Sequence, residues 1–357
     1  REFATQSELQ GRTLTMVGNS CKGQLVQAAL AAVPGEQCLI LGDIAGAREI
    51  ARLPVENFAH RSRALLRLQD GCESFCSYCI VPYTRGPSRS LPLAEAIAQA
   101  EVLAAAGHRE IVLTGIHLGK YGKDLPGKTD FRILLEQLSR ATPKTFYRIS
   151  SLEPTEISDA LLTLIAERDN IQSHLHIPLQ SGEDRILARM NRRYSTTQFR
   201  QVITRCKTVL PDAGIGIDIM AGFPGESEEQ FSSSYDFIAS LECSYLHAFP
   251  YSARPGTAAA LYPDQLKKAI KERRVRQLRQ LSDTKRRQFH QSQLGQTHPV
   301  LGEGRRDNDG LLHGFTGNYI PVHFPGPDSL LNTISQVRLL HLQGDSVIGQ
   351  RLATHED

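Results

Sequence analysis

Three cysteines, Cys72, Cys76 and Cys79, lie within eight residues of one another in the spacing C-x3-C-x2-C. The remaining cysteines are isolated along the chain: Cys21, Cys38, Cys206 and Cys243. Thiolates select zinc, copper(I) or iron–sulfur clusters, and a structural zinc ion or a [4Fe–4S] cubane is ordinarily held by four protein ligands. Three cysteines on a cubane leave one iron with an open position, as a catalytic metal centre requires. The alternatives are three unrelated thiols, or a zinc site that a distant histidine completes.

The elements that must position these cysteines alternate between strand and helix from residue 63 to about residue 250. Short β-rich runs predict strands at 64–69, 110–114, 146–150, 174–177, 214–220 and 245–249. Between them, helices are predicted at 93–107, 131–141 and 227–241, among others. Such alternation is typical of βαβ units and a parallel sheet, and six repeats predict an open, partial (βα)6 barrel. The cysteines follow the first strand, at the carboxyl-terminal edge where such sheets place their chemistry.

The flanking segments differ from this α/β core in composition. Residues 265–290 carry ten Lys or Arg against Glu272 and Asp283, a net charge of +8 in a chain whose total is +3. From about residue 296, short strands joined by Gly, Asn and Asp turns predict a small antiparallel β-barrel. We therefore expect a small α/β piece at 1–60, a core with its basic C-terminal helix at 61–295, and the small barrel at 296–357.

The composition is that of a globular protein, with 40% hydrophobic and 22% charged residues in 357. No apolar run approaches the ~18–20 residues that span a bilayer, and the first residues show no signal peptide. An unsealed cysteine cluster without an export signal predicts a protein of the reducing cytoplasm that needs no membrane.

The cysteine loop resembles that of the radical S-adenosylmethionine (SAM) enzymes, which show C-x3-C-x2-C with an aromatic residue before the last cysteine. Further segments resemble the methylthiotransferase family in order: "CSYCIVPYTRGPSRS", "IVLTGIHLGKYG", "ISSLEP", "HLHIPLQSG", "DIMAGFPGE" and "FPYSARPGT". The resemblance runs from about residue 63 to the C-terminus, where the small barrel is similar to the family's nucleic-acid-binding TRAM domain. Within the family, "TGIHLGKYG" resembles the branch that acts on tRNA at N6-threonylcarbamoyladenosine, beside the anticodon.

This resemblance implies a cofactor set. Cys72, Cys76 and Cys79 would be the catalytic ligands of a [4Fe–4S] cluster whose open iron chelates SAM, and an electron from the cluster would cleave SAM to a 5′-deoxyadenosyl radical. The predicted reaction adds a methylthio group at C2 of the modified adenosine. An electron donor such as flavodoxin or ferredoxin would be needed, and the sulfur donor is left open.

The resemblance also implies a set of SAM-binding residues: Tyr78, Gly115, Ser151, Glu153, Gln180 and Gly222. Two of these positions have alternative explanations, since Glu153 could be an acid that the dipole favours at a helix start, and Gly222 a simple strand-to-helix turn. His174 and His176 share one strand face, either as metal ligands or, more ordinarily, as satisfied core histidines. Cys206 and Cys243 are expected to be buried small hydrophobes.

The basic segment and the small barrel together predict RNA binding. The residues expected to contact the anticodon loop of tRNA are Arg85, Arg89, Lys267, Lys271 and Arg274. The alternative for a basic helix is a solvated face that binds nothing.

The first sixty residues do not match the family fully. Its members carry an N-terminal domain whose three further cysteines hold a second cluster, and here "FATQSEL" resembles only the segment just after the third of them, which would fall near Glu2. Neither Cys21 nor Cys38 matches these three. We therefore expect a truncated family member that has one cluster, with two alternatives: a radical SAM protein without sulfur insertion, and a tRNA-binding protein with a structural cluster.

Overall fold

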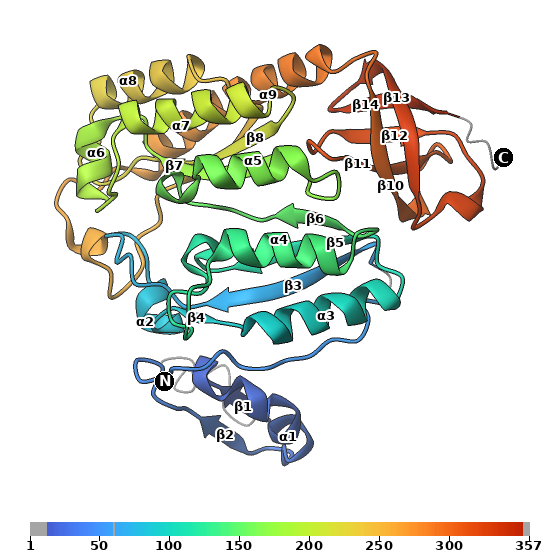
Figure 1. Ribbon diagram of the computed structural model, residues 1–357. Coiled ribbons are helices and arrows are strands. Elements are labelled where there is room, and N and C mark those ends of the chain that lie inside the picture. Colours follow the sequence, from blue (N-terminus) through green and yellow to red (C-terminus); the bar gives the residue numbers. More distant parts are fainter. Residues whose placement is uncertain (1–12, 60, 353–357) are drawn as a thin grey trace.

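Six parallel strands form the centre of the molecule, and neighbours in space are neighbours in the chain (Figure 1). The computed structural model describes residues 13–59 and 61–352, so "FATQSEL" and Glu2 lie outside the described residues. The central strands are β3 (Arg63–Asp70), β5 (Glu110–Gly115), β6 (Phe146–Ile149), β7 (His174–Gln180), β8 (Gly214–Ala221) and β9 (Tyr245–Pro250). The predicted α/β class with parallel sheets is confirmed.

The central strands hydrogen-bond as two sheets instead of one. The first has the order β4-β3-β5-β6, with β4 (Arg89–Ser90) as a short antiparallel edge strand, and the second has the order β7-β8-β9. A bridge between Tyr147 and Ile171 joins them, as does the hydrogen bond from Leu152 N to His176 O at 3.0 Å. The strands thus continue from one sheet into the next as an open barrel.

Helices cover the outer faces of both sheets (Figure 1). The main ones are α3 (Leu93–Ala105), α4 (Phe131–Ala141), α5 (Asp159–Glu167), α6 (Asp184–Arg189), α7 (Thr196–Val209), α8 (Glu228–Ala239) and α9 (Lys268–Ser292). Several begin where the sequence provides a polar cap: the Asp130 side chain accepts from Ile133 N at 2.8 Å, and Ser195 and Ser227 each open a capping box. Their apolar faces share one core with the strands, which includes Leu68, Leu103 and Ile217.

The chain after α9 forms a closed five-stranded barrel with the order β10-β11-β12-β14-β13. Its strands are β10 (Thr297–Arg306), β11 (Leu312–Thr316), β12 (Pro321–Phe324), β13 (Ile334–Gln343) and β14 (Ser346–Arg351). Alternate residues point inward and form a separate apolar core, with Val322, Phe324 and Val337 fully buried. The antiparallel barrel expected from the turn-rich sequence is therefore present, although β12 and β14 pair in parallel.

The small barrel covers the end of the central barrel at which the strands begin. Arg148 of β6 donates to the carbonyls of Thr316 and Gly317 at 3.1 and 3.0 Å while its Nε donates to buried Glu110 at 2.7 Å. Arg63, the first residue of β3, pairs with Glu110 and with Glu303 of β10. The contacts leave the opposite end of the central barrel, where the strands finish, for the site.

The N-terminal piece is small and lies beside the first sheet (Figure 1). It contains the parallel pair β1 (Leu14–Val17) and β2 (Gln37–Ile40), the 3-10 helix η3 (Asn19–Gln24) and α1 (Leu25–Leu30). Asn19 Nδ2 donates to Thr84 O at 2.7 Å in α2 (Val81–Arg85), next to the cysteine loop. None of the helices in the described ranges combines the length and the apolar character that crossing a bilayer requires.

Candidate active site

The loop that follows β3 carries all three clustered cysteines, and its backbone is tied at both ends. Cys72 N donates to Gly86 O at 3.0 Å, which closes the loop on itself. Gly71 has φ +80°, and a Cβ there would lie 1.9 Å from Pro87 O, so only glycine fits. The start of the loop is therefore fixed by the backbone before any cofactor is considered.

A second segment, distant in sequence, holds the middle of the loop. Ser77 N donates to Met190 O at 3.1 Å, and its hydroxyl donates to Arg189 O at 2.8 Å. Asn191 Nδ2 donates to Phe75 O at 2.9 Å. The turn at the end of α6 belongs to the second sheet's half of the molecule. It thus positions the cysteine loop that follows β3 of the first sheet.

Two of the three thiols have a cationic or protonatable partner. His117 Nδ1 lies 3.4 Å from Cys72 Sγ, and Arg192 Nη1 donates to Cys76 Sγ at 3.5 Å. Burial raises the pKa of Cys72, but the hydrogen bonds from His117 and Ser74 outweigh it and leave this pKa below its ordinary value. Burial, together with the neighbouring thiols, raises the pKa of Cys79. The thiolate form, which binds metal, is thus favoured at Cys72.

The partners of the thiols are held in turn by two carboxylates. His117 Nε2 lies 2.7 Å from Glu156 Oε1; burial lowers the pKa of His117, but its contacts with Cys72 and Glu156 raise it to about 9. Arg192 forms a close ion pair with Glu153. These groups line one cleft beside Cys76, together with Lys120 and Tyr194.

The donor set fits an iron–sulfur cluster better than one zinc ion. Four ligands on a single zinc, with Zn–S bonds of about 2.3 Å, stand roughly 3.8 Å apart. The sulfurs of Cys72, Cys76 and Cys79 do not all lie within 4.8 Å of one another, since one other group alone meets that limit among the described residues. On a cubane each cysteine binds a different iron, which suits three separated thiolates.

The predicted SAM-binding residues fall on both sheets. Tyr78 packs against the cluster of Met190, Phe223 and Tyr251, and burial raises its pKa well above the ordinary value. Ser151, half-buried, lies two residues before Glu153 after the end of β6. Glu153 precedes the short 3-10 helix Pro154–Glu156 and faces the cleft. The helix of its alternative explanation, α5, begins later and is capped by Ser158, so the SAM-binding role of Glu153 stays a prediction.

Gln180, at the end of β7, has features that fit a ligand-binding role. Its φ of +69° is unusual for a residue with a side chain. Its side-chain Oε1 is buried and has no hydrogen-bond partner within the described ranges. Such strain and such an unpaired acceptor are found preferentially at functional sites.

Both predicted glycines lie where a side chain would meet close neighbours within the protein. A Cβ on Gly115 would lie 3.1 Å from the Gln69 side chain. At Gly222, which has φ +75°, a Cβ would lie 2.3 Å from Lys271 Cγ, and the Gly222 N–H donates to Glu226 at 2.7 Å. The turn explanation therefore accounts for Gly222 without a cofactor.

Three residues at the site were not singled out from the sequence: Gln69, His117 and Arg192. Gln69 is fully buried; its Nε2 donates to Gly71 O at 2.7 Å and to Ser88 at 2.9 Å, and its Oε1 accepts from His117 N at 2.7 Å. The signal for His117 was its place in the loop after the second strand, within "GIHLGKYG". Gln69 and Arg192 carry no local signal, because the site residues that they contact, His117 for Gln69 and Cys76 and Glu153 for Arg192, are far away in the sequence.

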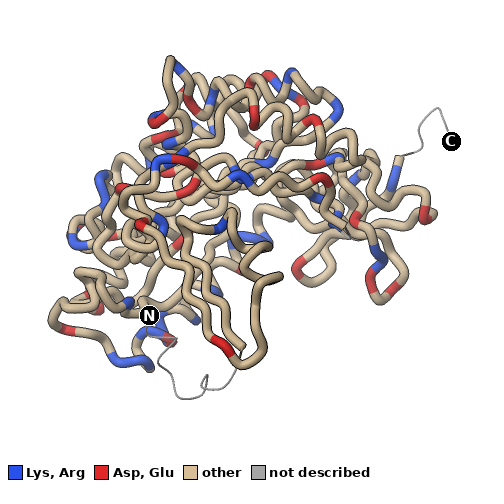
Figure 2. Tube along the Cα trace, turned by 90° about the horizontal axis from the view of Figure 1, so that it is seen from below, with Lys and Arg blue, Asp and Glu red and all other residues tan. Residues whose placement is uncertain are grey.

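The predicted RNA contacts on the basic helix need correction. Arg274 is 2% exposed and pairs with Glu226 and Glu228 at 2.7 and 3.0 Å, so the prediction that it contacts RNA is wrong. Lys271 Nζ donates to Tyr251 O at 3.0 Å. Lys285 likewise donates to the carbonyls of Ala239 and Leu241. Some of the basic side chains of residues 265–290 therefore bind acceptors within the protein instead of facing solvent. Figure 2 shows basic and acidic positions interspersed along the chain.

The cations beside the cysteine loop form a tighter group. Lys22, Arg67, Arg85 and Arg89 all lie within 3.8 Å of the Asp70 carboxylate. Arg89 is 3% exposed and is therefore unsuited to an RNA contact, which corrects that prediction too. Lys22, Arg67 and Arg85 are partly exposed, and one carboxylate leaves this group with a net positive charge. Lys267 is exposed at the start of α9.

Comparison with known proteins supports the interpretation of the cysteine loop as that of a radical SAM enzyme. Residues 66–238 match the radical SAM superfamily. The chain is 38% identical over 303 residues to the threonylcarbamoyladenosine tRNA methylthiotransferase MtaB of Bacillus subtilis (strain 168), which covers 84% of this chain and 67% of that protein. It is 33% identical over 326 residues to the tRNA-2-methylthio-N(6)-dimethylallyladenosine synthase of Sphingopyxis alaskensis, covering 91% and 73%.

One solved structure that resembles part of the chain is the radical SAM methyltransferase TsrM of Kitasatospora setae, at TM-score 0.47 and 15% identity, covering 56% of this chain and 38% of TsrM. The fold and the three-cysteine loop define a radical SAM enzyme. The chain belongs to the family of radical SAM tRNA methylthiotransferases. A [4Fe–4S] cluster and SAM are the cofactors of this class.

Proposed function

We propose that this protein adds a methylthio group at C2 of N6-threonylcarbamoyladenosine, next to the anticodon of tRNA. The observation that carries the proposal is the group of three thiols at the mouth of the barrel, two of them bonded to His117 and Arg192. The MtaB relative, named for threonylcarbamoyladenosine, supports this substrate over the dimethylallyladenosine of the second relative. The cluster and SAM would supply one-electron radical chemistry; flavodoxin or ferredoxin is the class of electron donor we propose.

The residues of the chain have separable tasks in this proposal. Cys72, Cys76 and Cys79 would hold the cluster, and the N–H groups of His117 and Arg192 would offset the negative charge of two thiolates. Glu153 and Glu156 fix these two partners in place. The unpaired Oε1 of Gln180 is available to accept a hydrogen bond from SAM, and Tyr78 offers an aromatic face.

For tRNA, the proposal uses the cations that remain available. Lys22, Arg67 and Arg85 lie beside the cysteine loop, where a phosphate next to the reacting base would pass. Lys267, with the exposed residues Arg276 and Arg279, extends the basic surface along α9. We further propose that the small barrel is a TRAM-like RNA-binding domain and that the protein acts in the cytoplasm, a compartment that a tRNA substrate and reduced thiols would both favour.

The direct test is nucleoside mass spectrometry after anaerobic reconstitution with iron and sulfide. With tRNA that lacks the C2 methylthio group, SAM, reductant and inorganic sulfide as the sulfur source, we expect about four irons per chain, cleavage of SAM and the 2-methylthio nucleoside. Cys76→Ala should lose iron and cleavage but retain tRNA binding, whereas Cys38→Ala, at an exposed cysteine of β2, should behave as wild type. SAM cleavage without a methylthio product would instead favour a radical SAM protein that does not insert sulfur.

The RNA surface has its own test. Arg276→Glu with Arg279→Glu should weaken tRNA binding and reduce the slope of log K against log[salt] by roughly 0.7 for each lost phosphate contact. An unchanged slope would reject the α9 surface and leave the group around Asp70 as the proposed RNA contact.

A further inference from the structure

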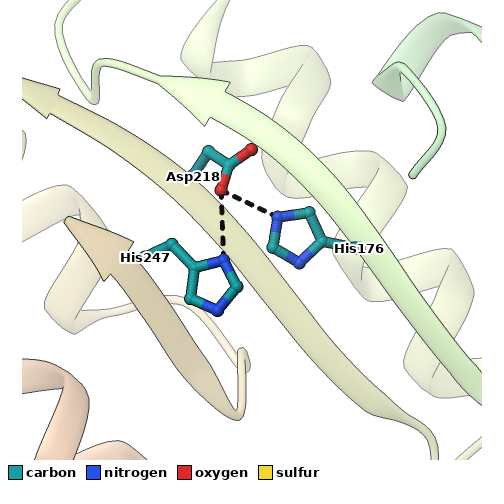
Figure 3. A group of neighbouring side chains, drawn as sticks. All are labelled: His176, Asp218 and His247. Carbon is teal, nitrogen blue, oxygen red and sulfur yellow. Dashed lines mark hydrogen bonds and ion pairs between the residues drawn. The ribbon is translucent and has the colours of Figure 1, made fainter. Parts of the chain in front are cut away.

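The three strands of the second sheet bring two histidines and an aspartate together inside the open barrel. In the β7-β8-β9 register, Asp218 is opposite Pro178 on one side and His247 on the other, and His176 lies two residues before Pro178. The residues on either side of each belong to the core beneath the helices: Leu175, Ile177, Ile217, Ile219, Leu246 and Ala248. Because side chains alternate along a strand, His176, Asp218 and His247 face away from the helices, into the barrel (Figure 3).

The three side chains converge on one point. His176 Nε2 lies 2.8 Å from Asp218 Oδ1, and His247 Nδ1 lies 3.5 Å from the same oxygen (Figure 3). Among the described residues, no other set of three His, Cys, Asp or Glu side chains has its ligand atoms within 4.8 Å of one another. Two imidazoles and a carboxylate form a recurring set of protein ligands for zinc and other divalent transition metals.

A chain of hydrogen bonds behind His176 decides which of its nitrogens is free. The Tyr245 hydroxyl lies 2.8 Å from His174 Nε2 and 3.4 Å from His176 Nδ1. His174 is 5% exposed, and the Tyr245 hydroxyl is the one hydrogen-bond partner of its Nε2 among the described residues. If the Tyr245 hydroxyl donates to His174, its oxygen accepts from His176 Nδ1–H.

In this tautomer His176 Nε2 carries a lone pair that points at a carboxylate oxygen 2.8 Å away, whereas in the other tautomer its N–H donates to that oxygen. Two lone pairs at that distance repel each other unless a cation lies between them. The cation is either a proton, which makes His176 an imidazolium, or a metal ion. A metal-binding histidine ordinarily donates its other ring N–H to a neighbour, as His176 does to Tyr245 in this arrangement.

We propose that His176, Asp218 and His247 bind a divalent transition-metal ion, of the class of Zn²⁺, inside the barrel and separate from the cysteine loop. The His247 side chain is 61% exposed, which gives the ion a path from solvent. Three protein ligands leave at least one coordination position for water or for an oxygen of a bound molecule. The strands fix the ligand positions through their register, so the site needs no loop to close over it.

Cobalt(II) is a suitable probe because its visible spectrum reports the ligand set. Protein with its cluster already reconstituted is titrated with Co²⁺. In the difference spectrum against the same protein without cobalt, we expect one ion per chain with d–d bands of a nitrogen and oxygen site, and no cobalt–thiolate charge-transfer band. Zn²⁺ should displace it.

Two variants locate the ion. His247→Ala and Asp218→Asn should each weaken Co²⁺ binding at least 100-fold, while thermal unfolding shows that they remain folded. His323→Ala is the matched control, because His323 pairs with Asp307 in the small barrel without belonging to such a set of three, and it should bind as wild type does.

Three results would overturn the proposal. The first is an absence of Co²⁺ binding, which would mean that a proton occupies the contact between His176 and Asp218. The second is equal binding by wild type and His247→Ala. The third is binding that shows thiolate charge transfer and disappears in Cys76→Ala, which would place the ion on the cysteine loop.

Discussion

The two halves of the central barrel hold their chemical groups in different ways. In the first sheet the cysteines lie beyond the end of β3. Their loop is held by hydrogen bonds to the Arg189 and Met190 carbonyls and by one from the Asn191 side chain. In the second sheet the histidines and the aspartate project from within the strands, so the register alone sets their spacing. A loop can adapt to a bulky cofactor but depends on distant contacts, whereas strand positions are rigid and depend on their own sheet.

Removing Arg274 should have the largest effect on stability, because it ties α9 to the loop after β8. Arg274→Ala leaves Glu226, which is 4% exposed, without its partner. Breaking a buried ion pair from one side costs about 3–5 kcal/mol. Urea unfolding would measure the loss. Arg276→Ala, at an exposed position of the same helix, should change stability by less than about 0.5 kcal/mol; equal losses would mean that Arg274 is not buried in solution.

A smaller loss of stability is expected for Gly71→Ala, and it should be confined to the cysteine loop of the first sheet. The new Cβ would clash with the Pro87 carbonyl and force φ +80° on alanine, which costs roughly 1–3 kcal/mol of local strain. We expect a lower iron content after reconstitution and no change in Co²⁺ binding by the second half. Gly107→Ala is the control, since Gly107 has φ +95° but an open space around it. If both variants keep their iron equally, steric contact with Pro87 does not position the loop.

The smallest effect near neutral pH should come from His290, where α9 meets the small barrel. Burial, reinforced by Arg286, lowers the pKa of His290 to about 4, below the ~6.5 of an unfolded chain. Its contribution to stability is therefore complete above about pH 6.5 and is lost as the pH falls toward 4, because the unfolded state binds the extra proton. Unfolding midpoints between pH 7 and 4.5 should fall less steeply in His290→Asn than in wild type. His341→Asn, at an exposed histidine, controls for loss of a histidine; a wild-type slope in His290→Asn would refute this assignment.

The sequence predicted most of the strands and helices because each is a short, locally encoded pattern. The run "ALLRLQ" lies within β3, and the basic segment 265–290 closely matches α9. The pattern could not show that Arg274 meets Glu226, because the two lie 48 residues apart and both look like surface charges. The division of the six strands into two sheets also depends on packing that no local run encodes.

The same distinction applies to the candidate site: residues that are close in the sequence could be predicted, and residues that only the fold brings together could not. The three cysteines lie within eight residues of one another, so their spacing alone indicates an iron–sulfur cluster. The pair of histidines on one strand was noticed, but Asp218 and His247 come from two other strands, and their convergence requires the register between them. His117 was within reach of sequence reasoning, whereas Gln69 and Arg192 act through partners that only the fold brings near.

The contacts between the small barrel and the start of the central strands bear on the order in which the chain is made. Arg148 emerges from the ribosome 168 residues before Thr316, and Asp212 emerges 106 residues before Asn318, to which they bind respectively. Until then the end of the central barrel at which the strands begin remains open to water, and Arg148 lacks two carbonyl acceptors. Domains generally fold in the order of synthesis, so the last five strands close this end of the central barrel only after the rest of the chain has been made.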